Sequence, residues 1–118
     1  MPLVFNTKTY TADSFASDSV GYIGAAKTVS AKDDLTMRRS KPKPSAVSSG
    51  VGRTFAKLQR TVNLTGALTP TGLISVETIV YAPVGVASAD VDAVLNDHGA
   101  LVSSADMKSH VKLQKISF

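Results

Sequence analysis

The chain has 118 residues, with 13 basic against 9 acidic side chains, a formal net charge of +4, no Cys and no Trp. This length suits a single domain, and the absence of Cys excludes disulfides, a thiolate nucleophile and a zinc ribbon. No apolar stretch is long enough to span a bilayer, and the first ten residues lack the basic and apolar regions of a signal peptide. We therefore expect a small, soluble, non-secreted domain.

Small side chains dominate the composition. Ser, Thr, Ala and Val supply 53 of the 118 residues, whereas only 7 residues are aromatic. A core built from Val, Ala and Leu gains little free energy per buried side chain, and a chain of this size leaves much of its surface exposed. A monomer would be marginally stable, so the composition favours a large interface shared with another subunit.

The basic residues are concentrated in the middle of the chain. The segment Lys27–Arg60 holds nine basic and two acidic residues, a net charge of +7, and the other 84 residues carry −3. A basic block on one surface suits a polyanion, because neutralising phosphates releases their counterions. The alternative is a solvated basic loop around Lys41–Pro44.

The first half of the chain predicts strands and turns. The segments Leu3–Tyr10 and Ser14–Ile23 are rich in β-branched and aromatic residues, with Asp13 between them. Apolar and polar residues then alternate over Leu35–Ser40. The segment Lys41–Gly52 has two prolines, two glycines and three serines, which predicts a turn-rich connection.

Two longer runs predict the centre of a sheet. Over Arg53–Thr65 apolar and polar residues alternate with period two, apart from Phe55 and Arg60, which is typical of a half-buried antiparallel strand. After a turn at Gly66–Gly72, the run Leu73–Ala82 has a similar pattern. The resulting sheet has one apolar and one polar face, and the apolar face needs a cover.

The pattern then changes to that of a helix. Apolar residues recur every three or four positions from Val91 to Val102. We expect Ser88 to be the N-cap, with Asp90 and Asp92 in the first turn, where carboxylates favour the helix dipole. Gly99 indicates a close packing contact or a nearby helix end.

A second, shorter helix is predicted to begin at Ser104, and the weak alternation of 111–118 predicts an extended tail. We therefore expect one domain over 1–118, divided into a β-sheet region 1–82, a helical region 88–110 and a tail 111–118. The fold class is α+β, with an antiparallel sheet of about six strands, including an N-terminal hairpin, followed by two C-terminal helices.

Motifs for catalysis or cofactor binding are weak. The Asp90 and Asp92 pair is better explained by the helix dipole than by a metal, and His98 and His110 lack the spacing of zinc ligands. Gly50–Gly52 lacks the third glycine of a dinucleotide site, and no serine lies in a G-x-S-x-G elbow. We expect neither an enzyme nor a cofactor, metal or small-molecule substrate.

The polar face of the sheet is the remaining candidate site. Lys57, Gln59, Thr61 and Asn63 project from one strand, and a neighbouring strand can contribute Arg38 and Ser40. Basic and amide side chains on a flat surface can bind phosphates and unstacked bases, and Tyr81 can stack on a base. The alternative is an ordinary solvated sheet face.

The order of these segments resembles the coat proteins of single-stranded RNA bacteriophages of the levivirus type. The resemblance covers nearly the whole chain and rests on order, length and patterning. It is carried by the strand LTMRRSK at Leu35–Lys41, the long strand RTFAKLQRTVNL at Arg53–Leu64, the loop Gly66–Gly72, the strand ISVETIVYAP at Ile74–Pro83 and the helix start ADVDAVL at Ala89–Leu95.

This resemblance implies an intertwined homodimer in which the helices of each chain pack over the partner's sheet. Dimers would form an icosahedral shell, with the loop Gly66–Gly72 around its symmetry axes, that encloses genomic single-stranded RNA. The chain would occur in the virion and, during assembly, in the bacterial host cytoplasm, without a membrane partner. The implied dimer core consists of Leu58, Val62, Leu64, Val76, Val80, Val91, Val94 and Leu95.

The resemblance also implies that the polar face points inward and binds RNA, including a hairpin whose binding represses translation. Glu77 repels phosphate there unless it pairs with Lys57 or Arg38. The implied RNA-binding residues are Thr36, Arg38, Ser40, Lys57, Gln59, Thr61, Ser75, Glu77 and Tyr81.

Two other functions remain open from the residues alone. One is a small cellular module that binds RNA or single strands as a soluble dimer, which the basic middle segment also suits. The other is a structural or adhesin-like β-domain without nucleic acid.

Overall fold

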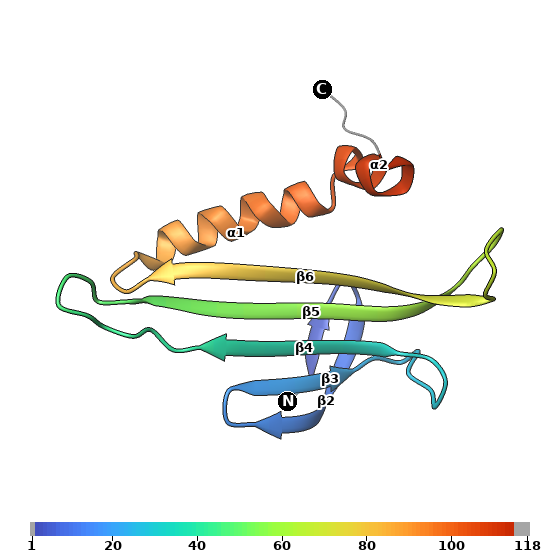
Figure 1. Ribbon diagram of the computed structural model, residues 1–118, viewed down its shortest axis with the longest axis horizontal. Helices are drawn as coiled ribbons and strands as arrows, with labels where there is room; N and C mark the ends of the chain where they lie inside the picture. Colours follow the sequence, from blue (N-terminus) through green and yellow to red (C-terminus); the bar gives the residue numbers. More distant parts are fainter. Residues whose placement is uncertain (1, 115–118) are drawn as a thin grey trace. The chain divides into compact units, whose positions relative to one another are not determined.

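The computed structural model describes residues 2–114 and divides the chain into two compact units, Met1–Val84 and Gly85–Phe118. The first unit is a single six-stranded sheet in which each strand pairs antiparallel with the next along the chain (Figure 1). The predicted α+β fold class, with six strands followed by two C-terminal helices, is confirmed. The strands are β1 Leu3–Phe5, β2 Lys8–Ala16, β3 Ser19–Ile23, β4 Asp33–Ser40, β5 Val51–Asn63 and β6 Thr71–Pro83.

The N-terminal strands divide differently from the prediction. The predicted strand Leu3–Tyr10 is interrupted by a two-residue turn in which Asn6 and Thr7 have positive φ angles of 50° and 59°. Two consecutive left-handed residues suit the tight turn of a hairpin. Asp13, which the sequence suggested as a break, lies inside β2 as the extra residue of a β-bulge, because the register with β3 shifts between Ala12 and Ser14.

The central strands are close to their predicted positions. Strands β5 and β6 each begin two residues before the predicted start, and the register pairs them along their whole length from Val51 with Pro83 to Asn63 with Thr71. The connection before β5 depends on Gly50, whose φ is +97° and whose added Cβ would lie 2.9 Å from the backbone nitrogen of Lys43.

The second unit contains helix α1, Ser88–Val102, and helix α2, Ala105–Leu113. The prediction of Ser88 as N-cap is wrong, because Ala87 occupies that position without a side-chain cap. Asp90 lies in the first turn of α1 as predicted, whereas Asp92 follows that turn. A Cβ at Gly99 would meet nothing within 4 Å among the described residues.

Helix α2 begins as predicted, because the Ser104 side chain accepts a hydrogen bond from the Met107 backbone N–H at 3.2 Å. The prediction of an extended tail is wrong for 111–113, which form the last turn of α2 before Gln114 adopts a left-handed φ of 53°. The rest of the predicted tail, 115–118, lies outside the described residues. Neither helix within 2–114 is long and apolar enough to cross a membrane.

Few side chains are buried. Among the described hydrophobic residues only Tyr10 and Leu35 are buried, at 0% and 8% exposure, and neither helix has a buried residue. Tyr10 also stacks on Phe5 with a centroid separation of 5.0 Å. The sheet unit therefore lacks the closed apolar core that normally stabilises a domain.

A buried polar cluster explains the arginine that interrupts the alternation of β5. The Tyr10 hydroxyl donates to Asp33 Oδ1 at 2.7 Å and accepts from Arg60 Nη2 at 2.6 Å, and Arg60 Nε donates to the same Asp33 oxygen at 3.3 Å. Asp33 is only 4% exposed. These side chains join β2 to β4 and β5 across β3. Gly24 makes room for them, because its added Cβ would lie 2.3 Å from Asp33 Oδ2.

The cluster fixes the protonation states of its members. Burial by itself would raise the pKa of Asp33, but hydrogen bonds from Tyr10, Arg60 and the Ala26 N–H outweigh it, and the pKa lies below its ordinary value. Burial and the bond to Asp33 raise the pKa of Tyr10. Asp33 is therefore ionised at neutral pH, and Tyr10 is a neutral donor.

Replacing Tyr10 by Phe tests this cluster. Tyr10→Phe removes the hydroxyl and leaves Asp33 short of a donor in a buried site, so we expect a loss of about 1–3 kcal/mol in the free energy of unfolding. Chemical denaturation at fixed protein concentration measures it. Tyr81→Phe is the control, because the Tyr81 side chain is 62% exposed. Equal stability of both variants would contradict the role of the cluster.

The lowered pKa of Asp33 predicts an acid-sensitive fold. The unfolded carboxyl takes up its proton at about pH 3.9, before the folded one does, so the stability that Asp33 contributes is present above that pH. It is lost as the pH falls toward the folded pKa. Denaturation at a series of pH values should show a steeper acid decline for the wild type than for Asp33→Asn. If the free energy of unfolding fell equally steeply with pH in Asp33→Asn, Asp33 would not be the source of the acid sensitivity. Asp18→Asn is the control, because Asp18 is exposed.

Candidate nucleic-acid interface

The register of β4, β5 and β6 sorts their side chains onto two faces. Lys57 pairs with Thr36 on one side and with Glu77 on the other, and side chains alternate along each strand. We call the face with even-numbered β4 residues and odd-numbered β5 and β6 residues the polar face, and the opposite one the apolar face. All nine side chains predicted to bind RNA lie on the polar face: Thr36, Arg38, Ser40, Lys57, Gln59, Thr61, Ser75, Glu77 and Tyr81.

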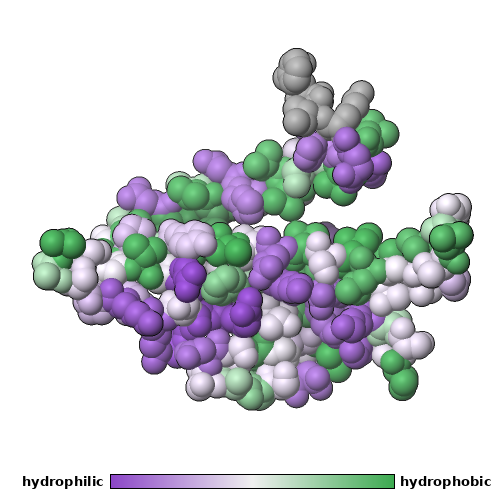
Figure 2. All heavy atoms as spheres, in the orientation of Figure 1, coloured by the Kyte–Doolittle hydropathy of each residue, from purple (hydrophilic) through white to green (hydrophobic). Residues whose placement is uncertain are grey.

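The polar face is the one seen in Figures 1 and 2. Tyr10 of β2 bonds to Asp33 and Arg60 on the apolar face, and the hairpin of β1 and β2 passes behind β4 and β5 in Figure 1. Figure 2 shows hydrophilic side chains gathered over the middle strands of the face in view. The sheet therefore presents an open platform with polar side chains along its centre.

A three-residue cluster, Arg38, Phe55 and Glu77, occupies the middle of the polar face. The Arg38 guanidinium lies over the Phe55 ring, 4.6 Å from the ring centroid, and its Nη2 lies 3.4 Å from Glu77 Oε1. The Arg38 and Glu77 side chains are 53% and 36% exposed. The pairing of Glu77 with Arg38, one of the two partners expected from the sequence, is confirmed, and Phe55 interrupts the polar row because it supports the guanidinium.

Three further predicted residues already form hydrogen bonds within the sheet unit. Gln59 Nε2 donates to Ser75 Oγ at 3.0 Å between β5 and β6. The Thr61 Oγ1 accepts from the Lys32 backbone N–H at 2.9 Å, which ties the end of β5 to the loop before β4. The hydroxyl hydrogens of Ser75 and Thr61 can still be donated to an external acceptor.

The register adds two residues that the sequence analysis did not select. Arg53 lies between Ser40 and Tyr81 on the polar face, which places a guanidinium beside an exposed ring. Asp34 lies opposite Gln59 and forms an ion pair of 3.1 Å with Lys27. Alternation placed Arg53 among the polar positions of β5, but only the pairing with β6 brings it next to Tyr81.

The face is cationic at its centre. Arg38, Arg53 and Lys57 lie on the strands themselves, where Asp34 and Glu77 are each engaged by a basic partner. Within residues 2–114, neither Arg53 nor Lys57 forms an ion pair. Such a surface can bind phosphates through its cations and bases through its amides, hydroxyls and exposed tyrosine.

The residues predicted for the dimer core divide between the two units. Leu58, Val62, Val76 and Val80 share the apolar face of the sheet, and Val76 is 46% exposed. Leu64 follows the end of β5, where its N–H donates to the Pro70 carbonyl at 2.8 Å. The other three lie on α1, where none is buried: Val91, Val94 and Leu95.

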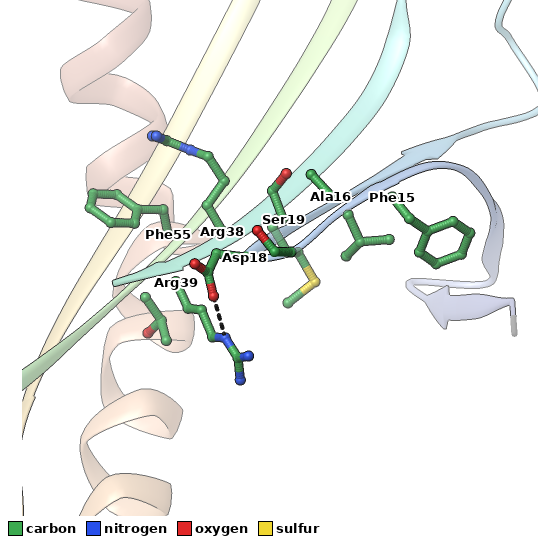
Figure 3. Close-up of a pocket in the computed structure, with 11 residues that line it drawn as sticks. Phe15, Ala16, Asp18, Ser19, Arg38, Arg39 and Phe55 are labelled. Atoms are coloured by element: carbon green, nitrogen blue, oxygen red, sulfur yellow. Dashed lines mark hydrogen bonds and ion pairs between the residues drawn. The ribbon is translucent and has the colours of Figure 1, made fainter. Parts of the chain in front are cut away.

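A shallow pocket lies where β4 runs past the turn between β2 and β3 (Figure 3). Arg38 and Arg39 project on opposite sides of β4 there, as their alternation requires. Arg39 Nε donates to Asp18 Oδ1 at 3.1 Å, which attaches this turn to β4. The apolar lining, which includes Phe15, Val20 and Met37, continues the apolar face. Within 2–114, no cluster of three or more His, Asp or Glu side chains could hold a metal ion.

Solved structures with the same fold are subunits of virus-like particles. The structure of Beihai levi-like virus 21 has a TM-score of 0.74 at 18% identity, covering 100% of this chain and 95% of that chain. That of bacteriophage GQ-907 has a TM-score of 0.75 at 15% identity, covering 98% and 88%. The virus-like particle of Beihai levi-like virus 32 has a TM-score of 0.72 at 19% identity, covering 93% of this chain and 83% of that chain.

No protein-family model matches the sequence, and no curated protein matches it. The similarity to these structures is thus seen in the backbone, at 15% to 19% sequence identity. It confirms, at the level of the fold, the resemblance inferred from the order of the segments.

Proposed function

We propose that this chain is the coat protein of a single-stranded RNA phage, a structural protein that assembles into a shell around RNA. The observation that carries the proposal is a two-faced sheet, incompletely covered on its apolar side, in a fold shared with subunits of levi-like virus-like particles. The chain would act in the virion and, during assembly, in the host cytoplasm.

The first step of assembly is a homodimer. Taken by itself, the sheet unit leaves Val76 and Ile74 about half exposed on its apolar face. Taken by itself, the helical unit has an apolar stripe of Val91, Val94 and Leu95 without a buried residue. Two copies that exchange these elements would cover both surfaces, and burial of apolar area is the main driving force of association.

The second step places RNA against the polar face. With the apolar face occupied by the dimer, the opposite face remains open, and its cations Arg38, Arg53 and Lys57 suit a phosphate backbone. Tyr81, 62% exposed, offers a ring on which a base can stack. A stem-loop of the genome held there would also repress translation of the message that contains it.

Electron microscopy of the purified chain tests this proposal. Expression of the chain alone should give uniform particles whose ultraviolet absorbance shows enclosed RNA. A soluble dimer that binds oligonucleotides with a steep salt dependence would support a cellular RNA-binding module instead. A protein with neither particles nor RNA would contradict both proposals.

Val76→Asp tests the role of the apolar face. We expect it to abolish the dimer, because a carboxylate without a partner in an apolar interface costs several kcal/mol. Ser75→Asp is the matched control, since the adjacent residue points to the polar face. Sedimentation of unassembled subunits measures the dimer. Loss of the dimer in both variants, or in neither, would contradict the assignment of the faces.

Arg38→Ala with Lys57→Ala tests the inward orientation of the polar face. The double variant should form particles with less RNA, because two cations that bind phosphates are lost. The slope of log affinity against log salt should also fall by about 0.7 for each lost phosphate contact with a single strand. Lys108→Ala with Lys112→Ala, which removes two charges from α2, is the control. The RNA content per particle is the measurement, and equal content in both double variants would argue against this interface.

A further inference from the structure

We propose that Glu77 is a built-in competitor that RNA phosphate must displace from Arg38, so that this carboxylate sets the affinity and salt response of the polar face. The inference rests on the proposed RNA-binding function and deepens it. In this proposal, Glu77 has a role in RNA binding although it is acidic and lies on a cationic surface. Phe55 positions the Arg38 guanidinium.

The geometry shows a guanidinium held from two sides. Arg38 Nη2 lies 3.4 Å from Glu77 Oε1, and the guanidinium carbon lies 4.6 Å from the centroid of the Phe55 ring. The three residues come from β4, β5 and β6, and the register places Arg38 directly opposite Phe55. The Arg38 guanidinium thus has a contact on two sides before any ligand arrives.

Carboxylate and phosphate compete for the same donors. A guanidinium presents a planar fork of N–H groups that matches the oxygens of either anion. The Arg38 side chain is 53% exposed, so a phosphate can reach it from solvent. Arg38 can therefore exchange Glu77 for a phosphate while remaining over the Phe55 ring.

The exchange makes Arg38 different from the other cations of the face. Within the described part of the chain, Arg53 and Lys57 have no carboxylate partner, and a phosphate gains their charge without displacing an anion. At Arg38, the ion pair with the phosphate forms only when the ion pair with Glu77 is lost. The Glu77 carboxylate is then left beside a phosphate, which repels it. Glu77 therefore weakens binding at this position and makes it easier to reverse.

Substitution of Glu77 by Gln measures this competition. The glutamine keeps the shape and removes the charge, so Arg38 becomes fully available. We expect the affinity for a labelled oligouridylate, measured by fluorescence anisotropy on the full chain, to rise by about threefold to tenfold, as expected for a surface ion pair together with the removed repulsion. In the wild-type complex, the displaced Glu77 carboxylate takes up a salt cation, which offsets one cation released from the RNA. Glu77→Gln removes this uptake, so the slope of log affinity against log salt should steepen by up to about 0.7.

Asp18→Asn is the matched control. Asp18 pairs with Arg39 at 3.1 Å and both side chains are about half exposed, so this is also a surface ion pair. Arg39 projects from β4 on the side opposite to Arg38. Asp18→Asn changes the net charge equally, so an equal rise in affinity in both variants would show a general charge effect and overturn the inference.

A double-mutant cycle shows whether Glu77 acts through Arg38. In an Arg38→Ala background, Glu77→Gln should give little further gain, and a gain as large as in the wild type would contradict competition for Arg38. Wild-type protein that binds no RNA would refute the proposed function itself. Wild-type binding that depends on Arg38 but is unchanged by Glu77→Gln would refute this inference alone.

Discussion

The rest of this structure depends on a sheet unit that does not close its own apolar face. The two longest strands pair along thirteen residues each, and this register separates apolar from polar side chains. Among the described hydrophobic residues only Tyr10 and Leu35 are buried. A surface of this kind is either an interface or a cause of aggregation. The proposed dimer follows from that constraint, and in such a dimer the polar face would stay open to RNA while the partner covers the apolar face.

The two residues that break the alternation of β5 have specific partners. Arg60 lies on the apolar face and is accommodated there by Asp33 and Tyr10, which accept hydrogen bonds from its guanidinium. Phe55 lies on the polar face and supports the Arg38 guanidinium. In both places the side chain that breaks the pattern contacts another residue of the same face. Arg60 stabilises the curled sheet, and Phe55 orients a cation that is proposed to bind phosphate.

The division of the sheet would separate two requirements of the proposed coat protein. Self-association needs desolvation of a large apolar area, whereas binding of RNA needs exposed cations that remain in exchange with solvent and salt. Placing the two on opposite faces of one sheet lets each be satisfied without weakening the other. The acidic residues of the polar face, Asp34 and Glu77, are each paired with a basic side chain, which moderates its positive charge.

The sequence by itself determined the three central strands, the two helices and the face on which each central side chain lies, because period-two and period-three-to-four patterns reflect backbone geometry directly. It also brought the nine candidate RNA-binding residues onto one face. The tight turn at Asn6 and Thr7, the bulge at Asp13 and the pairing of Arg53 with Tyr81 in the sheet register were decided by tertiary structure. These features depend on the register between strands, and register is set by pairing over long sequence separations that no local pattern contains.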